Sequence, residues 1–426
     1  MNRLTTSWGD LTLTRHPEDP RDPLRAWDAA DEYLLNHLAE TGTDLSGTVA
    51  VLGDRWGALV TALSTAGAGA GAGASAGAGA SAGAGAGADG GGGADGGGGV
   101  GAAGEAGGAA LVQISDSYLG REATRANLAR AGAAPGAVRL LTTQDPPPAR
   151  IDVLLVRVPK SLALLEDQLH RLAPAVHEGT VIVGTGMVKE IHTSTLTLFE
   201  RILGPTRTSL AVKKARLIHT TPDRSAAPGP NPWPHRYALP ADTPAPGLAG
   251  RTVTNHAGVF CADRLDIGTR FLLGHLPTGI GHARVADLGC GNGVVGLAVA
   301  LAEPDAELLF TDESYQAVAS AEENFRAHAG DGRKAEFTVG DGLADVPDGS
   351  LDLVLNNPPF HSHQATTDRT ARRMFSDARR ALRPGGELWV VGNRHLGYHV
   401  TLRRIFGNSE LVASDPKFVV LRAVRR

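Results

Sequence analysis

The chain has 426 residues, of which 42% are hydrophobic and 20% charged, a balance typical of a folded globular protein. It contains two cysteines, too few for a disulfide framework, and no apolar stretch as long as a membrane span. We therefore expect a protein of the reducing cytoplasm with no membrane partner. The net charge is −4, but residues 361–426 carry 13 basic against 5 acidic side chains, which indicates an anionic ligand near that part.

The first half of the chain contains four short apolar runs separated by segments of helical length. These runs predict buried strands at Thr48–Leu52, Ala110–Ile114, Ile151–Val156 and Thr180–Val183. Between the first two lies the stretch 66–108, which holds 21 of the 55 glycines, first alternating with alanine and then in runs of four. Because this composition offers little to bury in a packed core, we predict a disordered loop there.

Residues 222–246 hold eight of the 25 prolines. They predict a connection, 222–250, between an N-terminal domain, 1–221, and a C-terminal domain, 251–426. Beyond the connection, apolar runs again alternate with helical segments. The strands predicted there are Arg284–Leu288, Glu307–Thr311, Leu351–Leu355 and Glu387–Val391. Strands separated by helices favour parallel sheets, so both halves are predicted to be α/β domains.

The two halves also resemble each other in sequence. Three pairs of segments match: 48–59 with 283–297, 114–132 with 310–328, and 151–160 with 351–360. The spacing from Gly53 to Asp116 is 63 residues, whereas that from Gly289 to Asp312 is 23, and the difference is close to the length of the glycine-rich stretch. We therefore predict a duplicated α/β domain whose N-terminal copy carries an insert before its second strand.

The sharper functional signals lie in the second copy. Its first predicted strand runs into Gly289-Cys-Gly-Asn-Gly293, where glycines allow a tight turn and the close approach of a ligand. The helix that follows is expected to direct its first amides at the same ligand. Asp312 ends the next strand, where a carboxylate is able to accept hydrogen bonds from both hydroxyls of a ribose. Taken alone, the pattern also fits a dinucleotide site or a turn that binds nothing.

The discriminating residues follow the strand Leu351–Leu355 and read Asn356-Asn-Pro-Pro-Phe-His361. The side-chain oxygen of Asn357 and the carbonyl of Pro358 are able to accept hydrogen bonds from an exocyclic amino group, and Phe360 is able to stack on a planar ring. Such acceptors orient the nitrogen lone pair toward an electrophile and stabilise the positive charge that develops on nitrogen. This chemistry disfavours a nicotinamide dehydrogenase, which transfers hydride instead.

With these motifs the chain resembles the S-adenosylmethionine-dependent methyltransferases with a Rossmann-like fold. It resembles more closely the bacterial ribosomal RNA guanine-N2 methyltransferases with duplicated domains, above all those of the large subunit (23S). The closer resemblance is carried by segments 26–35, 158–169, 191–206, 213–218, 265–277, 393–408 and 417–424. It implies two tandem class I methyltransferase domains of α/β type, with a degenerate N-terminal copy. It further implies a cytoplasmic monomer that methylates N2 of one guanine in 23S rRNA.

Carried over to this sequence, the resemblance assigns six residues to S-adenosylmethionine: Asp287, Gly289, Gly291 and Gly293 to its methionine part, Asp312 to its ribose and Asp341 to its adenine. Phe260 and residues 265–268 are expected to cover this cofactor. The residues expected to hold the guanine and act in catalysis are Asn357, Pro358 and Phe360. No metal is expected, and Cys290 is predicted to pack rather than to react.

The N-terminal copy departs from both motifs. Its turn reads Gly53-Asp-Arg-Trp-Gly57, without the middle glycine, and its second motif reads Val156-Arg-Val-Pro-Lys160, without the amide or the aromatic ring. This copy is therefore predicted to bind no cofactor. Five of its basic residues are candidates for contact with RNA phosphates, with solvated surface charge as the alternative: Arg157, Lys160, Lys213, Lys214 and Arg216. A second basic run is predicted to be a helix that binds phosphates, with a solvated face as the alternative: Arg369, Arg372, Arg373, Arg379 and Arg380.

Other functions stay open at the level of sequence. The nearest is guanine-N2 methylation of 16S rRNA, which uses the same motifs. Methylation of protein glutamine or of DNA adenine is more distant, and a non-catalytic RNA-binding factor for ribosome assembly belongs to a different class. The substrate is either the naked 23S rRNA or a ribosomal particle.

Overall fold

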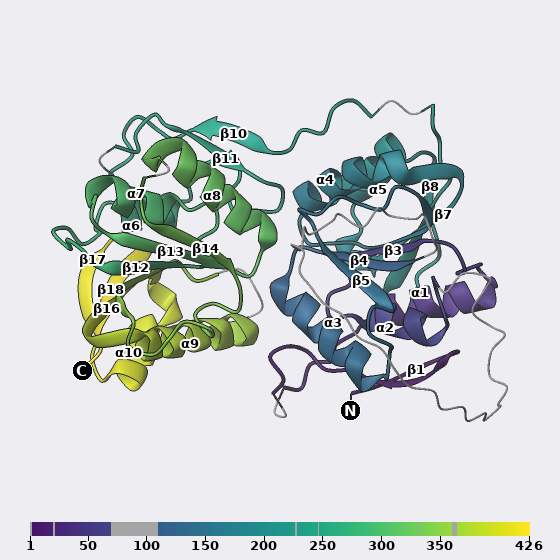
Figure 1. Cartoon of the computed structure of the whole chain (residues 1–426), viewed down its shortest axis with the longest axis horizontal. Helices are drawn as coiled ribbons and strands as arrows, with labels where there is room; N and C mark the ends of the chain where they lie inside the picture. Colours follow the sequence, from purple (N-terminus) through teal and green to yellow (C-terminus); the bar gives the residue numbers. More distant parts are fainter. Residues whose placement is uncertain are drawn as a thin grey trace, which may run out of the picture.

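The computed structural model describes residues 2–19, 22–69, 110–225, 228–245, 247–330, 332–359 and 364–426, without the side chains of 364–368. Phe360, His361 and all but residues 66–69 of the predicted disordered insert lie outside these described residues. Within them, no helix is long and apolar enough to cross a membrane. Figure 1 shows two α/β halves that lie side by side, the N-terminal half in purple to teal and the C-terminal half in green to yellow.

The N-terminal half is built on a seven-stranded sheet with the order β5-β4-β3-β6-β7-β9-β8. Its strands are β3 (Val49–Leu52), β4 (Leu111–Ser115), β5 (Val138–Thr142), β6 (Ile151–Arg157), β7 (Val176–Met187), β8 (Thr206–Thr208) and β9 (Ala215–Thr220). Its helices are α1 (Ala29–Glu40), α2 (Ala58–Thr65), α3 (Tyr118–Arg130), α4 (Leu162–Leu172) and α5 (Thr193–Ile202), with short 3-10 turns η1 (Ala173–Ala175) and η2 (Val188–Glu190). A hairpin of β1 (Arg3–Thr6) and β2 (Gly9–Thr12) precedes them.

The C-terminal half repeats this plan with the order β14-β13-β12-β15-β16-β18-β17. Its strands are β12 (Arg284–Leu288), β13 (Glu307–Asp312), β14 (Ala335–Val339), β15 (Leu351–Asn356), β16 (Leu382–Asn393), β17 (Glu410–Ser414) and β18 (Phe418–Val424). Its helices are α6 (Ile267–Leu273), α7 (Val294–Ala302), α8 (Tyr315–Ala329), α9 (Gln364–Ala381) and α10 (Tyr398–Phe406), with the turn η3 (Arg394–Leu396). The matching strand order confirms the predicted duplication.

Both sheets are mixed rather than wholly parallel. Five neighbouring strands run parallel in each sheet, as the spacing predicts. In the N-terminal sheet, β9 pairs antiparallel with β7 and with β8. In the C-terminal sheet, β18 pairs antiparallel with β16 and with β17. Only a short loop joins β8 to β9, or β17 to β18, and two strands linked in this way can pair only antiparallel. The register of the central strands is also repeated, since Leu52 lies opposite Val156 and Leu288 opposite Asn356.

Each sheet buries an apolar layer on both of its faces. In the N-terminal half α1 and α2 cover one face, while α4 and α5 cover the other. In the C-terminal half α6, α7 and α8 cover one face, while α9 and α10 cover the other. The carboxyl ends of the parallel strands are left free to form a site, which is where open α/β sheets bind ligands.

One glycine is kept in both copies for a packing reason. Gly57 and Gly293 precede α2 and α7 with φ of 79° and 77°, a conformation that side chains disfavour. A Cβ at Gly57 would lie 2.6 Å from Thr124 Oγ1, and one at Gly293 would lie 2.8 Å from the Cβ of Ala321. These glycines therefore let the helix after the first strand approach the helix after the second.

The described residues of the proline-rich connection run from the N-terminal half to the C-terminal half (Figure 1). Near its start, Asn231 Nδ2 donates to Asp167 at 2.7 Å and the Trp233 indole donates to Glu166 at 3.1 Å, which ties the connection to the N-terminal half. Further on, β10 (His235–Ala238) pairs antiparallel with β11 (Thr252–Asn255), and three of the following apolar residues join the core of the C-terminal half: Leu239, Ala245 and Leu248. The segment therefore packs against both halves.

Candidate active site

A cavity of about 580 Å³ lies at the carboxyl ends of β12, β13 and β15. The turn after β12, the segment before α6 and the helix α9 surround it. Seven of the predicted site residues line it: Asp287, Gly289, Gly291, Asp312, Asp341, Asn357 and Pro358. Gly293 adjoins the lining residues Asn292 and Val294, and Phe360 lies outside the described residues. Phe260, Leu265 and Asp266, from the segment expected to cover the cofactor, also line the cavity, as does Leu119 from the N-terminal half.

The glycine turn after β12 leaves space for a ligand against its backbone. Gly289 and Gly291 have φ of 71° and 54°, and a Cβ at Gly291 would meet no atom within 4 Å. Gly291 is therefore required by its conformation and not by packing. Asp287 links the end of β12 to the first turn of α7 and so stabilises the glycine turn between them. Its Oδ2 accepts a hydrogen bond from the amide of Gly296 at 2.8 Å. Burial raises the pKa of Asp287 to about 7.

Asp312 lies beside this turn with its carboxylate held in a fixed orientation. Its Oδ2 accepts from the Gly291 amide and its Oδ1 from the Ser314 amide, each at 3.0 Å. Each oxygen retains a further lone pair, so the carboxylate is able to accept two hydroxyl hydrogens at once. Burial raises the pKa of Asp312. Hydrogen bonds donated by two hydroxyls of a ligand would favour its charged form.

Asp341 forms an ion pair inside the cavity. Its two carboxylate oxygens pair with Arg373 of α9, at 2.6 Å and 3.1 Å. Arg373 therefore lines the cavity and neutralises Asp341, instead of contributing to an external strip of positive charge. Three further residues of α9 line the cavity, and none of them was predicted from the sequence: Thr370, Met374 and Asp377. Nothing in their spacing sets them apart, because only the packing of α9 on the sheet brings them to the site.

Asn357 is oriented by the start of α6. Its Nδ2 donates to Thr269 Oγ1 at 2.9 Å and more weakly to Asp266 Oδ2 at 3.4 Å. The Thr269 hydroxyl itself donates to Asp266 Oδ2 at 3.2 Å, so it has only a lone pair to offer Asn357. The amide nitrogen must therefore face α6. The remaining atom, Asn357 Oδ1, is buried and has no hydrogen-bond partner among the described residues.

Replacing Thr269 by valine is expected to lower the turnover of the methyl transfer that the sequence predicts by about fivefold, because one hydrogen bond of about 1 kcal/mol no longer orients the Asn357 amide. Serine at the same position is expected to restore most of the rate, and the affinity for S-adenosylmethionine should stay within about twofold of the wild type. Steady-state kinetics together with calorimetry would measure both quantities. A valine variant as fast as the wild type would contradict this role.

Comparison with known proteins places the chain. The family model "RLMG N-terminal domain" matches residues 1–70 and 103–224, and "Methyltransferase small domain" matches 250–422. Ribosomal RNA large subunit methyltransferase G of Streptomyces avermitilis is 67% identical over 423 residues, 99% of each chain. The protein of the same name from Ectopseudomonas mendocina is 47% identical over 420 residues, again 99% of each chain. The chain belongs to the ribosomal RNA large subunit methyltransferase G family.

A solved structure shares the two-domain architecture of this chain. A 16S rRNA N2 G1207 methyltransferase of T. thermophilus matches with a TM-score of 0.67 at 20% identity, over 100% of this chain and 97% of that chain. The fold is therefore that of two tandem Rossmann-like methyltransferase domains. The gap in the match to the N-terminal family model, 71–102, falls within the glycine-rich stretch, which is extra to the family's domain.

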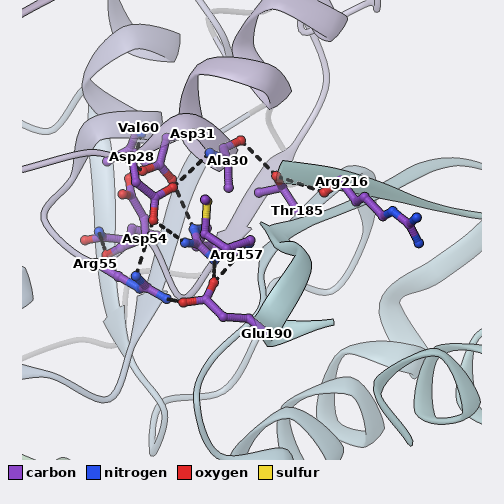
Figure 2. Close-up of polar contacts among 12 residues, drawn as sticks. Asp28, Ala30, Asp31, Asp54, Arg55, Val60, Arg157, Thr185, Glu190 and Arg216 are labelled. Atoms are coloured by element: carbon purple, nitrogen blue, oxygen red, sulfur yellow. Dashed lines mark hydrogen bonds and ion pairs between the residues drawn. The ribbon is translucent and has the colours of Figure 1, made fainter. Parts of the chain in front are cut away.

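In the N-terminal copy, Arg157 occupies the position that corresponds to Asn357. Figure 2 shows its guanidinium among carboxylates from the start of α1 and from η2. It pairs with Asp28 at 2.7 Å, Asp31 at 3.3 Å and Glu190 at 3.0 Å, and its side chain is 0% exposed. The prediction that Arg157 contacts RNA phosphates is therefore wrong, because buried intramolecular carboxylates already satisfy its charge.

A second charge completes this buried cluster. Arg55, which replaces the middle glycine of the turn, donates to Glu190 at 2.9 Å and lies 3.5 Å from Asp28. Burial opposes the ionisation of Glu190, but the guanidiniums of Arg157 and Arg55 outweigh it and lower the pKa of this carboxyl to about 2. The two motifs that form the cavity of the C-terminal copy are thus joined here by ion pairs.

Asp54 shows how the degenerate copy keeps its helix in place. It corresponds in sequence to Cys290, which is buried in the core of the other copy as expected for a packing residue. The Oδ2 of Asp54 accepts from the Val60 amide at 2.9 Å, as Asp287 does from Gly296. Burial raises the pKa of Asp54 to about 7.

This carboxyl is expected to make stability depend on pH. Folded Asp54 keeps its proton up to about pH 7, whereas the unfolded chain releases it near 3.8, so the native state binds more protons between these values. Its contribution to the free energy of unfolding is therefore expected to fall by up to about 1.4 kcal/mol per pH unit in this window and to level off above it. Urea unfolding at several pH values should show a shallower decline for Asp54→Asn, and parallel profiles would contradict the expectation.

The other basic candidates divide between paired and solvated side chains. Lys160 and Lys214 are exposed, whereas Lys213 pairs with Glu32 at 3.0 Å. The second basic run does form a helix, α9, but three of its five arginines are paired within the chain: Arg369 with Asp19 and Asp22, Arg373 with Asp341, and Arg380 with Asp348. Arg372 and Arg379 are exposed, which leaves a smaller cationic face on α9 than the sequence predicts.

Proposed function

We propose that the protein transfers a methyl group from S-adenosylmethionine to the exocyclic N2 amino group of a guanine in 23S rRNA. Relatives that are 67% and 47% identical over nearly the full chain are named as large-subunit rRNA methyltransferases. The fold relative from T. thermophilus, a 16S rRNA N2 methyltransferase, was solved with AdoMet and guanosine. The higher identity to large-subunit enzymes favours 23S over 16S rRNA.

The observation that carries the proposal is the Asn357 side chain. Its Nδ2 is already committed to Thr269 and Asp266, while its Oδ1 is buried and unpaired among the described residues. A buried acceptor without a donor costs about 1–3 kcal/mol, so it is expected where a ligand supplies the donor. An exocyclic amino group supplies such a donor, whereas a carboxylate substrate supplies none.

The residues around the cavity fit S-adenosylmethionine. Asp312 has a fixed carboxylate suited to the ribose hydroxyls, and Gly291 leaves the backbone open to the methionine part. Asp287 supports this turn from beneath through its bond to Gly296. Asp341 and Arg373 would contact the adenine as one ion pair without net charge. When bound, S-adenosylmethionine supplies an electrophilic methyl group attached to a positively charged sulfur.

The protein's own residues then prepare the attacking nitrogen. Asn357 Oδ1 and the Pro358 carbonyl accept the two hydrogens of the amino group, which turns its lone pair toward the methyl carbon. As the nitrogen–carbon bond forms, the bond between the methyl carbon and sulfur breaks and its electron pair neutralises the sulfur, which leaves as a thioether. Both acceptors stabilise the positive charge that develops on nitrogen. The proton passes to water after the attack, so no strong general base is needed. Phe360 remains the candidate for stacking on the guanine.

The proposal extends to the setting of the reaction. A guanine must leave its stack to reach a cavity of this kind, so we propose an unpaired target nucleotide. We propose that the reaction takes place in the cytoplasm, because its substrate is ribosomal RNA. We also propose that the protein acts as a monomer, and the mechanism assigns no step to a metal.

The test is methylation in vitro with purified protein and isotopically labelled S-adenosylmethionine. The RNA substrates are 23S and 16S transcripts and large subunits taken from cells that lack the gene. Mass spectrometry of the digested nucleosides is expected to show N2-methylguanosine in 23S RNA, either naked or in the particle, and none in 16S RNA. Label in adenine, in protein or in 16S RNA alone would refute the proposal.

A further inference from the structure

The two halves meet through the turns that follow their second strands. The Tyr118 amide donates to the Glu313 carbonyl at 2.8 Å, and the Tyr315 amide donates to the Asp116 carbonyl at 3.1 Å. These reciprocal bonds join Ser117 and Ser314 as an antiparallel bridge. The interface is thus nearly symmetric in its backbone and lies directly beside Asp312.

The side chains break this symmetry at Asp116. This residue corresponds in the duplicated sequence to Asp312, but its carboxylate reaches across into the other half. Its Oδ2 accepts from the Ser314 hydroxyl at 2.6 Å, and its Oδ1 accepts from the Gln316 amide at 2.9 Å. Thr143 of its own half donates to the same Oδ1 at 2.8 Å and holds the carboxylate in place.

These contacts complete the N-terminus of α8. A helix begins with amides that have no partner inside it. The amides of Tyr315 and Gln316 bond to Asp116, and that of Ala317 bonds to Ser314 Oγ at 3.1 Å. Ser314 therefore has three tasks, because its hydroxyl bonds Asp116 and caps the helix, while its amide donates to Asp312 Oδ1. The carboxylate also suits the positive end of the helix dipole.

Asp312 and Asp116 point in different directions because their local surroundings differ. Asp312 turns into its own half because the Gly291 amide is open to its Oδ2. At the corresponding position of the N-terminal copy stands Arg55, whose side chain is engaged by Glu190. The N-terminal copy has no glycine turn for Asp116 to contact, and the side chain of Asp116 points to the neighbouring half.

We propose that Asp116 is a positioning residue for cofactor binding in the other half of the molecule. It holds Ser314, and Ser314 in turn holds the carboxylate of Asp312 in the orientation that accepts the ribose. The former ribose residue of the degenerate copy thus supports the ribose residue of the active copy. This inference rests on the proposed function, since it takes Asp312 to bind the ribose of S-adenosylmethionine.

The test is calorimetric titration of the full chain with S-adenosylmethionine in the absence of RNA. Asp116→Ala removes both side-chain contacts across the interface and is expected to raise the dissociation constant by about tenfold. Asp116→Asn keeps the shape but loses one of the two acceptors, and a rise of about threefold is expected. The asparagine variant decides the question if the alanine variant does not fold.

The matched control is Gln144→Ala. Gln144 also crosses the interface, to the side chain of Gln316, but does not touch the turn from Asp312 to Ser314. Its cofactor affinity should stay within about twofold of the wild type. In kinetics, the Asp116 variants should show a raised KM for S-adenosylmethionine with kcat and the KM for RNA unchanged, a split that general destabilisation would not produce.

Unchanged affinity in a folded Asp116→Asn variant would overturn the inference, and so would an equal loss in Gln144→Ala. Failure of the proposed function has a different signature, because the wild-type chain would then bind no S-adenosylmethionine at all. The two outcomes are therefore separable in one set of titrations.

Discussion

Replacing Asn357 by alanine is expected to lower methyl transfer by at least about 10²-fold, the cost typical of removing one group that stabilises developing charge in an active site. The alanine variant loses the side-chain acceptor that we propose for the amino group, so the nitrogen lone pair should no longer be oriented. Single-turnover measurement with labelled S-adenosylmethionine and 23S RNA would give the rate of the chemical step.

Cofactor binding provides the internal control for this prediction. The contacts of Asn357 run to α6, whereas those of Asp312 run to the glycine turn and to Ser314. The affinity of Asn357→Ala for S-adenosylmethionine, measured by calorimetry, should therefore remain within a few-fold of the wild type. An equal loss of binding and of transfer would mean that Asn357 supports the cavity and does not act on the substrate.

Replacing Arg157 by methionine is expected to destabilise the protein by about 3–5 kcal/mol, although this residue lies in the half without a cofactor motif. The substitution removes the charge that three carboxylates share and leaves Asp28, Asp31 and Glu190 with Arg55 as their remaining cation (Figure 2). Burial already raises the pKa of Asp31 to about 6, and the loss of Arg157 would raise it further. Urea unfolding followed by tryptophan fluorescence would measure the change.

Lys160→Ala is the matched control for that experiment. Lys160 lies three residues further along the same segment but is exposed, so its loss is expected to change the free energy of unfolding by about 0.5 kcal/mol or less. A similar small effect for Arg157→Met would contradict the view that the cluster stabilises the N-terminal half. Loss of RNA affinity in Arg157→Met without loss of stability would revive the phosphate-binding hypothesis.

These two substitutions stand at corresponding positions of a duplicated domain and are expected to fail in different ways. The copy that keeps Asn357 holds a cavity with an unpaired acceptor, whereas the copy with Arg157 holds a cluster of ion pairs. Asp116 shows the same divergence, because it contacts the neighbouring half where Asp312 lines the cavity. Loss of the cofactor motif thus released polar residues for stabilising and positioning roles.

Much of the site followed from local sequence. The glycine turn, Asp312 and Asn357 were predictable because each sits directly after a buried strand, and the carboxyl ends of parallel strands meet at one edge of a sheet. The duplication was predictable for a similar reason, since the same motifs recur in the same order. The roles of the cofactor and guanine residues stay predictions until binding and activity are measured.

The sequence by itself predicted the two α/β units, their duplication and which copy keeps the cofactor and substrate motifs. Only the tertiary structure decided that Arg157 is buried, that Arg373 neutralises Asp341, and that Asp116 reaches Ser314. The physical reason is that a charged side chain takes its role from whichever opposite charge or donor comes within about 3 Å of it. Those partners lie between 32 and 198 residues away along the chain, a separation that no local pattern can encode.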